Sequence, residues 1–171
     1  MQFSTKPRIL AIAPGAQYVG LAVLEGEDLI WFGVKSFPGQ KTVESLLESA
    51  KQIVEDFISR YQPSIVVVED PFYAQARLSP LVRALHGAIK RWSRQRGLRV
   101  MSYRPTAVKE RLCPGKKTRK TLGEAVVRRF PFLYGRPLKT WHYWQQMLEA
   151  IALGILALTD VKNGRENAGT K

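Results

Sequence analysis

The feature that most constrains the fold is a short apolar run in the middle of the chain, Ser64-Ile65-Val66-Val67-Val68-Glu69, which follows Pro63. β-Branched residues favour strands, and a strand without alternation of apolar and polar residues is typically buried on both faces. Other elements must therefore cover both sides of the sheet that contains this strand. The run also ends in a carboxylate, Glu69, at the edge of that buried strand.

The periodicity on either side of this run predicts the other elements. Apolar runs bounded by turn residues predict strands, and apolar spacings of three and four residues predict helices. The expected strands cover residues 8–13, 19–24, 29–37, 64–69 and 98–103. The expected helices begin at Thr42, at Ser79 as N-cap, at Pro105, at a capping box Thr121-x-x-Glu124 and near Thr140, and the last of them ends near Thr159. This order predicts an α/β domain.

Length and composition narrow the class of protein. A chain of 171 residues can bury a core as one domain, which we expect at residues 1–160, with a disordered tail over 161–171. The longest apolar run, residues 150–158, has nine residues, whereas a bilayer span needs about 20. The single cysteine, Cys113, cannot form an internal disulfide. That fits a reducing, cytoplasmic compartment, or an organelle matrix in a eukaryote.

The charge is strongly basic and unevenly distributed. Lys and Arg number 27 against 14 acidic residues, which gives a net charge of +13. Residues 77–129 hold 16 basic and 2 acidic side chains, residues 1–76 hold 6 and 9, and residues 130–171 hold 5 and 3. A solvated surface is the alternative, but a stretch so rich in one charge repels itself unless a polyanion neutralises it. We therefore expect nucleic acid as the partner.

Several motifs in this order carry a resemblance to a known family. They are residues 9–15 with Gly20, residues 66–69 with Phe72, Lys109 and Lys120 around a glycine loop, and residues 149–153. Together they resemble the RuvC family of Holliday junction resolvases. The resemblance spans most of the chain and implies an RNase H-like fold, with a mixed five-stranded sheet and helices on both faces. It also implies a structure-selective DNA endonuclease that resolves four-way junctions by metal-dependent phosphodiester hydrolysis.

Such hydrolysis needs an activated water and a stabilised leaving oxygen, which two Mg²⁺ (or Mn²⁺) ions about 4 Å apart can provide. Mg²⁺ prefers hard oxygen ligands, so carboxylates from separate elements must converge. Glu69 and Glu149 are the candidate metal ligands. The alternatives are a solvated strand-end carboxylate for Glu69 and a helix acid with a basic partner for Glu149.

The sequence departs from the family pattern at two catalytic positions. An aspartate precedes Pro-Gly in the family, and Ala13 stands there in this chain. One helical turn before Glu149, where the family commonly has an acidic residue or His, the chain has Gln146. Two explanations account for Ala13: an engineered substitution that disarms a nuclease, or a natural loss that leaves a binding protein. Because Gln146 is a second altered position in the same site, we weigh the two explanations about equally. In either case Ala13 should prevent or weaken cleavage.

Three further residues near these positions have open roles. Gln146 could ligate a metal through its carbonyl oxygen or hold a water. His142 lies on the same helical stripe and could assist a proton transfer, bond a phosphate, or simply pack among its aromatic neighbours. Asp70 should point to the side opposite Glu69, because successive strand residues alternate, and we expect it to play a structural or supporting role.

Recognition of DNA should come from the basic middle segment. The resemblance implies DNA contact for Lys109 and Lys120. It also implies that Phe72, an aromatic residue beside the catalytic strand, stacks on a base. The alternative is that Phe72 is an ordinary core residue. Arg83, Lys90 and Arg94 fall on one helical ridge. The full set of expected DNA-binding residues is Phe72, Tyr73, Arg83, Lys109, Lys116, Lys117, Arg119 and Lys120.

The pseudo-two-fold symmetry of a four-way junction calls for a homodimer, which the family resemblance also implies, with the helix from Ser79 to Arg96 as the expected interface. Two other function classes stay open: a catalytically inactive junction- or DNA-binding protein, and an RNase H-like nuclease that acts on RNA. The glycine spacing from Gly15 to Gly20 is also found in phosphate loops of ATPases, but no Lys-Ser/Thr follows Gly20, which excludes a P-loop.

Overall fold

A computed structural model describes residues 6–15, 17–37, 42–70, 80–115, 119–134 and 141–164. Within these residues one sheet holds β1 (Arg8–Pro14), β2 (Tyr18–Glu25), β3 (Asp28–Ser36), β4 (Ile65–Glu69) and β5 (Arg99–Tyr103). The strand order is β3-β2-β1-β4-β5. The first three strands pair antiparallel, whereas β4 pairs parallel with β1 and with β5. The mixed five-stranded sheet expected from the sequence is confirmed.

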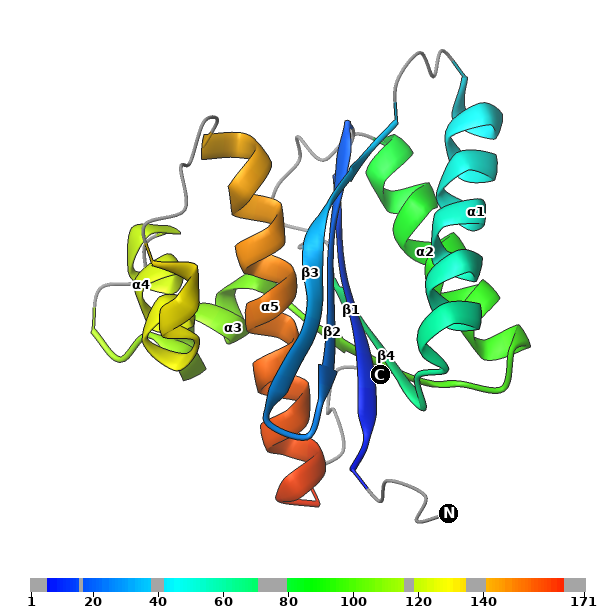
Figure 1. Cartoon of the computed structure of the whole chain (residues 1–171). Helices are drawn as coiled ribbons and strands as arrows, with labels where there is room; N and C mark the ends of the chain where they lie inside the picture. Colours follow the sequence, from blue (N-terminus) through cyan, green and yellow to red (C-terminus); the bar gives the residue numbers. More distant parts are fainter. Residues whose placement is uncertain are drawn as a thin grey trace.

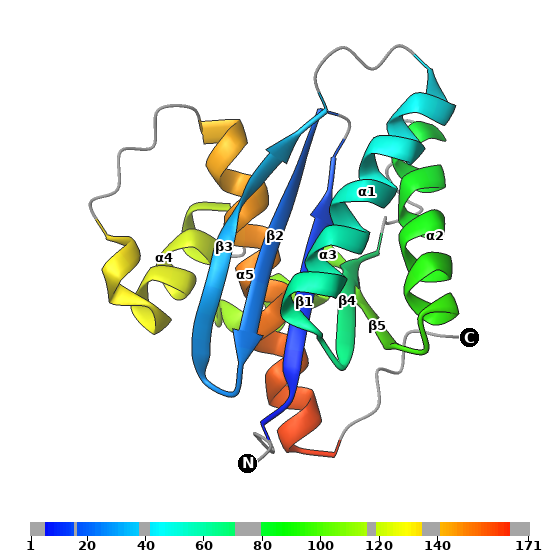
Figure 2. The same cartoon turned by 45° about the vertical axis from the view of Figure 1, so that its right-hand side comes forward.

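Helices cover both faces of the sheet, as expected. The helices are α1 (Val43–Tyr61), α2 (Pro80–Gln95), α3 (Pro105–Leu112), α4 (Arg119–Arg129) and α5 (Trp141–Lys162), with a 3₁₀ turn, η1, at Pro131–Leu133. Figures 1 and 2 show α1 and α2 on one side of the sheet and α3, α4 and α5 on the other. In the part of the chain that is described, no helix combines the length and the apolar character needed to cross a membrane.

The alternation of side chains along β1 divides the core in two. Ile9, Ala11 and Ala13 pack in the cluster that includes α5 residues, whereas Leu10 and Ile12 pack against α1 and α2. All five side chains are fully buried. A strand that is apolar on both faces needs such a layer on each side, so the sequence pattern of the central strands accounts for the three-layer arrangement.

Two glycines let α5 pack directly on β2. A Cβ atom at Gly20 would lie 2.0 Å from the backbone oxygen of Gln146, and one at Gly154 would lie 2.2 Å from Leu24 Cδ1. A larger residue at Gly20 would meet the backbone of α5 and push the helix away from the sheet, whereas one at Gly154 would displace the Leu24 side chain. These glycines therefore help to set the distance between α5, which carries Glu149, and the strands that carry the other half of the site.

Two expectations about helix boundaries are wrong. Helix α4 begins at Arg119, so Thr121 lies inside the helix and cannot be its N-cap, which requires a non-helical backbone. The last helix extends past Thr159 to Lys162, and Asp160 is only 3% exposed. Asp160 packs within the domain because it bonds to Arg111 and Tyr103. The residues after Leu158 are mostly polar, so their sequence does not reveal these bonds. Residues 165–171 of the expected tail lie outside the described residues.

Candidate active site and nucleic-acid interface

Glu69 is the last residue of β4 and is half-buried. Ile65 and Val67 of the same strand pack on the side of α5, and side chains two residues apart share a face, so Glu69 is on that face as well. In the neighbouring strand, Ile12 pairs with Val68. One residue further along, Ala13 of β1 therefore lies beside Glu69.

Glu149 reaches the site from α5. Its side chain is half-buried, and Gln145 Nε2 donates a hydrogen bond of 2.7 Å to Glu149 Oε1. Its helix neighbours Met147 and Ala150 are buried in the core. The burial of these neighbours fixes the rotation of α5 and holds Glu149 at the margin of the core, which is consistent with a site residue rather than a fully solvated surface acid.

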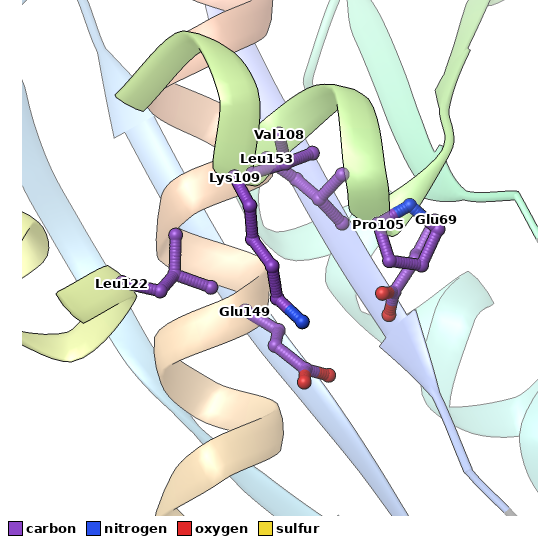
Figure 3. A pocket seen from close by; sticks show the side chains of 7 residues that line it. All are labelled: Glu69, Pro105, Val108, Lys109, Leu122, Glu149 and Leu153. Carbon is purple, nitrogen blue, oxygen red and sulfur yellow. The ribbon is translucent and has the colours of Figure 1, made fainter. Parts of the chain in front are cut away.

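The structure brings the two glutamates together in one small pocket (Figure 3). Its space amounts to about 10 Å³, which is roughly the room that one water molecule needs. Four elements contribute to it: β4, α3, α4 and α5. The residues that line it are Glu69, Pro105, Val108, Lys109, Leu122, Glu149 and Leu153.

Lys109 of α3 lies in the same pocket, where the sequence predicted only a DNA contact. In Figure 3 the lysine side chain extends from α3 into the pocket with its amine end toward the carboxylate of Glu149. Lys109 is half-buried, and the preceding residue, Val108, is 4% exposed and packs in the core. The pocket therefore combines two carboxylates with one ammonium group.

Ala13 is fully buried in the core cluster below α5. It is not one of the residues that line the pocket, although its strand position puts it next to Glu69. A methyl group offers no ligand to a metal ion. An aspartate in its place would add a third carboxylate at this edge of the sheet.

Gln146 fits closely against the turn that follows β1. A Cβ atom at Gly15 would lie 1.9 Å from Gln146 Nε2 and 2.8 Å from the Tyr18 carbonyl oxygen, so glycine leaves room for the amide in the position it occupies. Among the described residues, Gln146 Oε1 is buried and has no hydrogen-bond partner. Gln146 therefore packs as a neutral group against the backbone of the site.

Asp70 points away from Glu69, as the alternation along the strand predicted. Its Oδ1 atom lies 3.4 Å from His86 Nε2 and 3.9 Å from Lys90 Nζ, both on α2. Its backbone N–H donates a hydrogen bond of 2.7 Å to the Tyr103 carbonyl of β5. Asp70 therefore ties the end of β4 to α2 and β5 and supports the position of Glu69.

Burial also changes the titration of the two α2 residues. It lowers the pKa of His86 to about 4, an effect that the Lys90 ammonium increases and Asp70 opposes. Burial likewise lowers the pKa of Lys90, against the attraction of Asp70. Because Lys90 is held beside Asp70, the expected ridge of Arg83, Lys90 and Arg94 is wrong for Lys90, while the two arginines are exposed.

A partly buried charge network that the sequence analysis missed joins α3 to α5. Arg111 donates hydrogen bonds of 2.8 Å and 2.5 Å to the two carboxylate oxygens of Asp160, and the Tyr103 hydroxyl donates one of 2.6 Å to Asp160 Oδ2. Burial and the bond to Asp160 raise the pKa of Tyr103. This network fixes α3, and with it Lys109, against the helix of Glu149. No local pattern could reveal it, because the three residues come from separate elements.

The remaining expected DNA-binding residues are only partly covered by the structure. Arg83 is exposed on α2. Arg119 and Lys120 form the start of α4, and His142 lies in the first turn of α5; their side chains are outside the described set. Four further residues lie outside the described residues altogether, namely Phe72, Tyr73, Lys116 and Lys117.

The side chains that the structure describes do not fit the centre of two divalent ions that the family resemblance implies. Two carboxylates line the pocket, and the side chain of Lys109 shares it. Across the described residues, no set of three or more His, Cys, Asp or Glu side chains is close enough to hold a metal ion. Two ions about 4 Å apart would need more carboxylate oxygen than these two side chains supply.

Sequence comparison identifies similar proteins over most of the chain. The family profile described as crossover junction endodeoxyribonuclease RuvC matches residues 9–155. A crossover junction endodeoxyribonuclease RuvC of Akkermansia muciniphila is 31% identical over 107 residues, which cover 60% of this chain and 64% of that protein. The protein of the same name from Thermomicrobium roseum is 29% identical over 125 residues, which cover 71% and 77%.

Solved structures share the fold. Thermus thermophilus RuvC in complex with a Holliday junction substrate superposes with a TM-score of 0.75 at 21% identity, over 92% of this chain and 96% of that one. A fowlpox virus resolvase, also in complex with Holliday junction DNA, superposes with a TM-score of 0.58 at 14% identity, over 90% and 98%. These similarities confirm the RNase H-like arrangement expected from the sequence.

Proposed function

Because the chain belongs to the RuvC family of crossover junction endodeoxyribonucleases, we propose that it is a structure-selective endonuclease of four-way DNA junctions whose hydrolytic site is disarmed at Ala13. The observation that carries this proposal is the pocket that joins Glu69 of β4 to Glu149 of α5. Ala13 lies beside Glu69 at the edge of the same sheet. Two of the proposed catalytic carboxylates thus share one pocket, while the residue beside Glu69 at position 13 is a buried methyl group.

Divalent-metal dependence is typical of the nucleases of this family. In this chain an active centre would need a further carboxylate next to Glu69, and the proposal is that Ala13→Asp supplies it. We expect the variant to cleave in Mg²⁺ or Mn²⁺, with two ions per site as the requirement of the chemistry. The unmodified chain should then bind junctions and cut them slowly or not at all.

The proposed junction-binding surface combines the basic middle segment with the stacking aromatics. Lys109, Lys116, Lys117, Arg119 and Lys120 would contact phosphates, and Arg83 would extend the same charge. Phe72 would stack on an unpaired base, with Tyr73 as a second candidate. A net charge of +13 supports this role, because contacts with phosphates provide most of the affinity of such proteins and make it dependent on salt.

We also propose a homodimer with α2 at the interface, because two symmetric cuts require two sites that face the same way. The measurement is sedimentation equilibrium at the concentrations at which junctions are bound. A monomer in the bound complex would contradict the dimer.

The proposed location is the cytoplasm, where a reduced Cys113 persists.

The experiment that tests the main proposal is a gel shift and a cleavage assay on a synthetic four-way junction, with linear duplex of the same sequence as the competitor. The unmodified chain and Ala13→Asp should both prefer the junction, and only Ala13→Asp should cut it in Mg²⁺ or Mn²⁺. The matched control is the double variant Ala13→Asp/Glu149→Gln, which should bind and not cut. Equal affinity for duplex and junction would refute the junction selectivity, and no gain of cleavage across several branched DNAs would refute disarming at Ala13.

A second candidate is a dedicated junction-binding protein without nuclease activity. The packing of neutral Gln146 against Gly15 favours it, because two altered positions in one site are then accounted for together. In that case Ala13→Asp binds junctions and does not cut, even when a carboxylate is also installed by Gln146→Asp.

A nuclease that acts on RNA is distinguished by comparing four-way DNA with structured RNA in one salt titration.

A further inference from the structure

We propose that the turn after α4 is a stacking platform for unpaired nucleotides of DNA. Its members are the exposed rings of Phe132 and Tyr134 and the neighbouring guanidinium groups of Arg128 and Arg129, together called the η1 patch. The proposal rests on the proposed function in taking DNA as the partner. It adds a contact surface outside the Glu69–Glu149 pocket and outside the DNA-binding residues expected from the sequence.

Two aromatic side chains at η1 are exposed to solvent. Phe132 is 54% exposed and Tyr134 is 84% exposed. The Phe132 ring also extends an aromatic row, because its centroid lies 5.9 Å from that of Phe32 in β3 and 6.0 Å from that of Phe130. Single exposed apolar residues are ordinary, but a group of rings at one place on the surface marks an interaction site.

The backbone of η1 is fixed, so the two rings are held in place before any partner binds. Phe130 and Leu133 are 5% and 6% exposed and pack in the core cluster that includes α5 residues. The Leu133 N–H donates a hydrogen bond of 3.0 Å to the Phe130 carbonyl, and the Tyr134 N–H donates one of 3.0 Å to the Pro131 carbonyl. A base could therefore stack here without the cost of ordering a loop first.

Two arginines lie beside the rings. Arg128 and Arg129 are exposed in the last turn of α4, and the guanidinium carbon of Arg129 lies 5.2 Å from the Phe130 ring centroid. Glu27 lies 3.9 Å from Arg129 and pairs more closely with Lys162, at 2.6 Å. Guanidinium groups next to aromatic rings are the combination that contacts the phosphates and stacks the bases of a single strand.

Helix α4 connects the η1 patch to the candidate active site. Leu122 lines the pocket, and from there to Arg129 the helix rises about 10 Å. The helix carries four basic residues and one acidic residue, Glu124. A DNA strand at the pocket could follow α4 to the exposed rings. This continuity with the proposed junction surface favours DNA over a protein as the occupant.

The first test measures the affinity of the full chain for a labelled oligothymidylate of about ten nucleotides by fluorescence anisotropy. Phe132→Leu and Tyr134→Leu keep an apolar side chain and remove the ring, so each should weaken binding by about fivefold or more. Tyr134→Phe keeps the ring and should bind like the unmodified chain. The matched control is Val43→Ala on α1, where Val43 is 48% exposed, and it should leave the affinity unchanged.

The salt dependence of the same binding separates the rings from the charges. Tyr134→Leu should leave the slope of log affinity against log salt unchanged, whereas Arg128→Gln should reduce its magnitude by about 0.7. The control is Arg60→Gln on α1, where the Arg60 side chain is 60% exposed, and it should leave the slope unchanged. Tyr134→Leu binding the oligonucleotide as tightly as the unmodified chain would overturn the proposal.

Photo-crosslinking locates the contact in the unmodified chain and needs no variant to fold. An oligothymidylate that carries 5-iodouracil should crosslink to the tryptic peptide of residues 130–139, which holds both rings. Crosslinks confined to other peptides would overturn the proposal. A shift in the monomer–dimer equilibrium of Tyr134→Leu, with unchanged oligonucleotide affinity, would instead make the η1 patch a contact between copies of the chain and overturn it as well.

The failure of the proposed function has a different signature. Equal affinity of the unmodified chain for a four-way junction and for linear duplex would refute the proposed junction selectivity. The single-strand affinities and the crosslinked peptide would not change in that case, so the two failures are distinguishable.

Discussion

Replacing Asp160 by asparagine removes the charge that holds α3 and β5 to the end of α5. Asp160 is 3% exposed and accepts hydrogen bonds from Nη1 and Nη2 of Arg111 and from the Tyr103 hydroxyl. Asparagine has nearly the same shape, so the Asp160→Asn change tests the charge rather than the packing. The amide can accept fewer bonds from Arg111, and the guanidinium then stays beside a neutral group.

Loss of one partner of a buried ion pair typically costs about 3–5 kcal/mol. The Arg111 side chain is 33% exposed and can return partly to water, which places the expected loss near the lower end, at about 3 kcal/mol. For a domain of this size each kcal/mol lowers Tm by about 2–4 °C, so Tm should fall by about 6–12 °C. Urea denaturation followed by circular dichroism, with calorimetry for Tm, measures both quantities.

The matched control is Asp56→Asn, which breaks a surface pair four residues apart on α1. In that pair the side chains of Arg60 and Asp56 are 60% and 54% exposed, and the expected loss is below about 0.5 kcal/mol. A loss for Asp160→Asn within about 1 kcal/mol of this control would refute the conclusion that the network stabilises the domain.

Burial lowers the folded-state pKa of His86 from 6.5 to about 4. Between these two pH values the unfolded chain binds a proton that the native chain does not. The free energy of unfolding therefore falls as the pH falls through this range, by on the order of 3 kcal/mol. His86→Gln should flatten this dependence in urea titrations from pH 7 to 4, and parallel curves for the two proteins would contradict the assignment. Gly20→Ala should destabilise the chain by about 1–3 kcal/mol, because the new Cβ would lie 2.0 Å from the Gln146 backbone oxygen. Gly123→Ala in α4 should instead stabilise the chain by about 0.5–1 kcal/mol, because the new Cβ would lie an acceptable 3.4 Å from Leu148 Cδ1. Melting curves that rank the two variants in the opposite order would refute the packing argument.

The sequence alone determined the order of the elements and the layered fold, because these follow from local periodicity. The unbroken apolar run of β4 required cover on both faces, and α1 and α2 pack on one of them. Alternation along the strand also predicted that Asp70 points away from Glu69, and the contacts of Asp70 with α2 agree. The capping box at Thr121 was wrong, because a short polar motif is compatible with the interior of a helix as well as with its start.

Only the tertiary structure decided which charged groups meet. Lys109 was predicted as one of several DNA-binding lysines, yet it shares a pocket with Glu69 and Glu149. No role was predicted for Asp160, yet it is buried between Arg111 and Tyr103. Periodicity shows which face of an element is apolar, but ion pairs between elements depend on the packing distance and rotation of whole helices. In this chain those are set by close contacts such as that of Gly20 with α5, which no local pattern records.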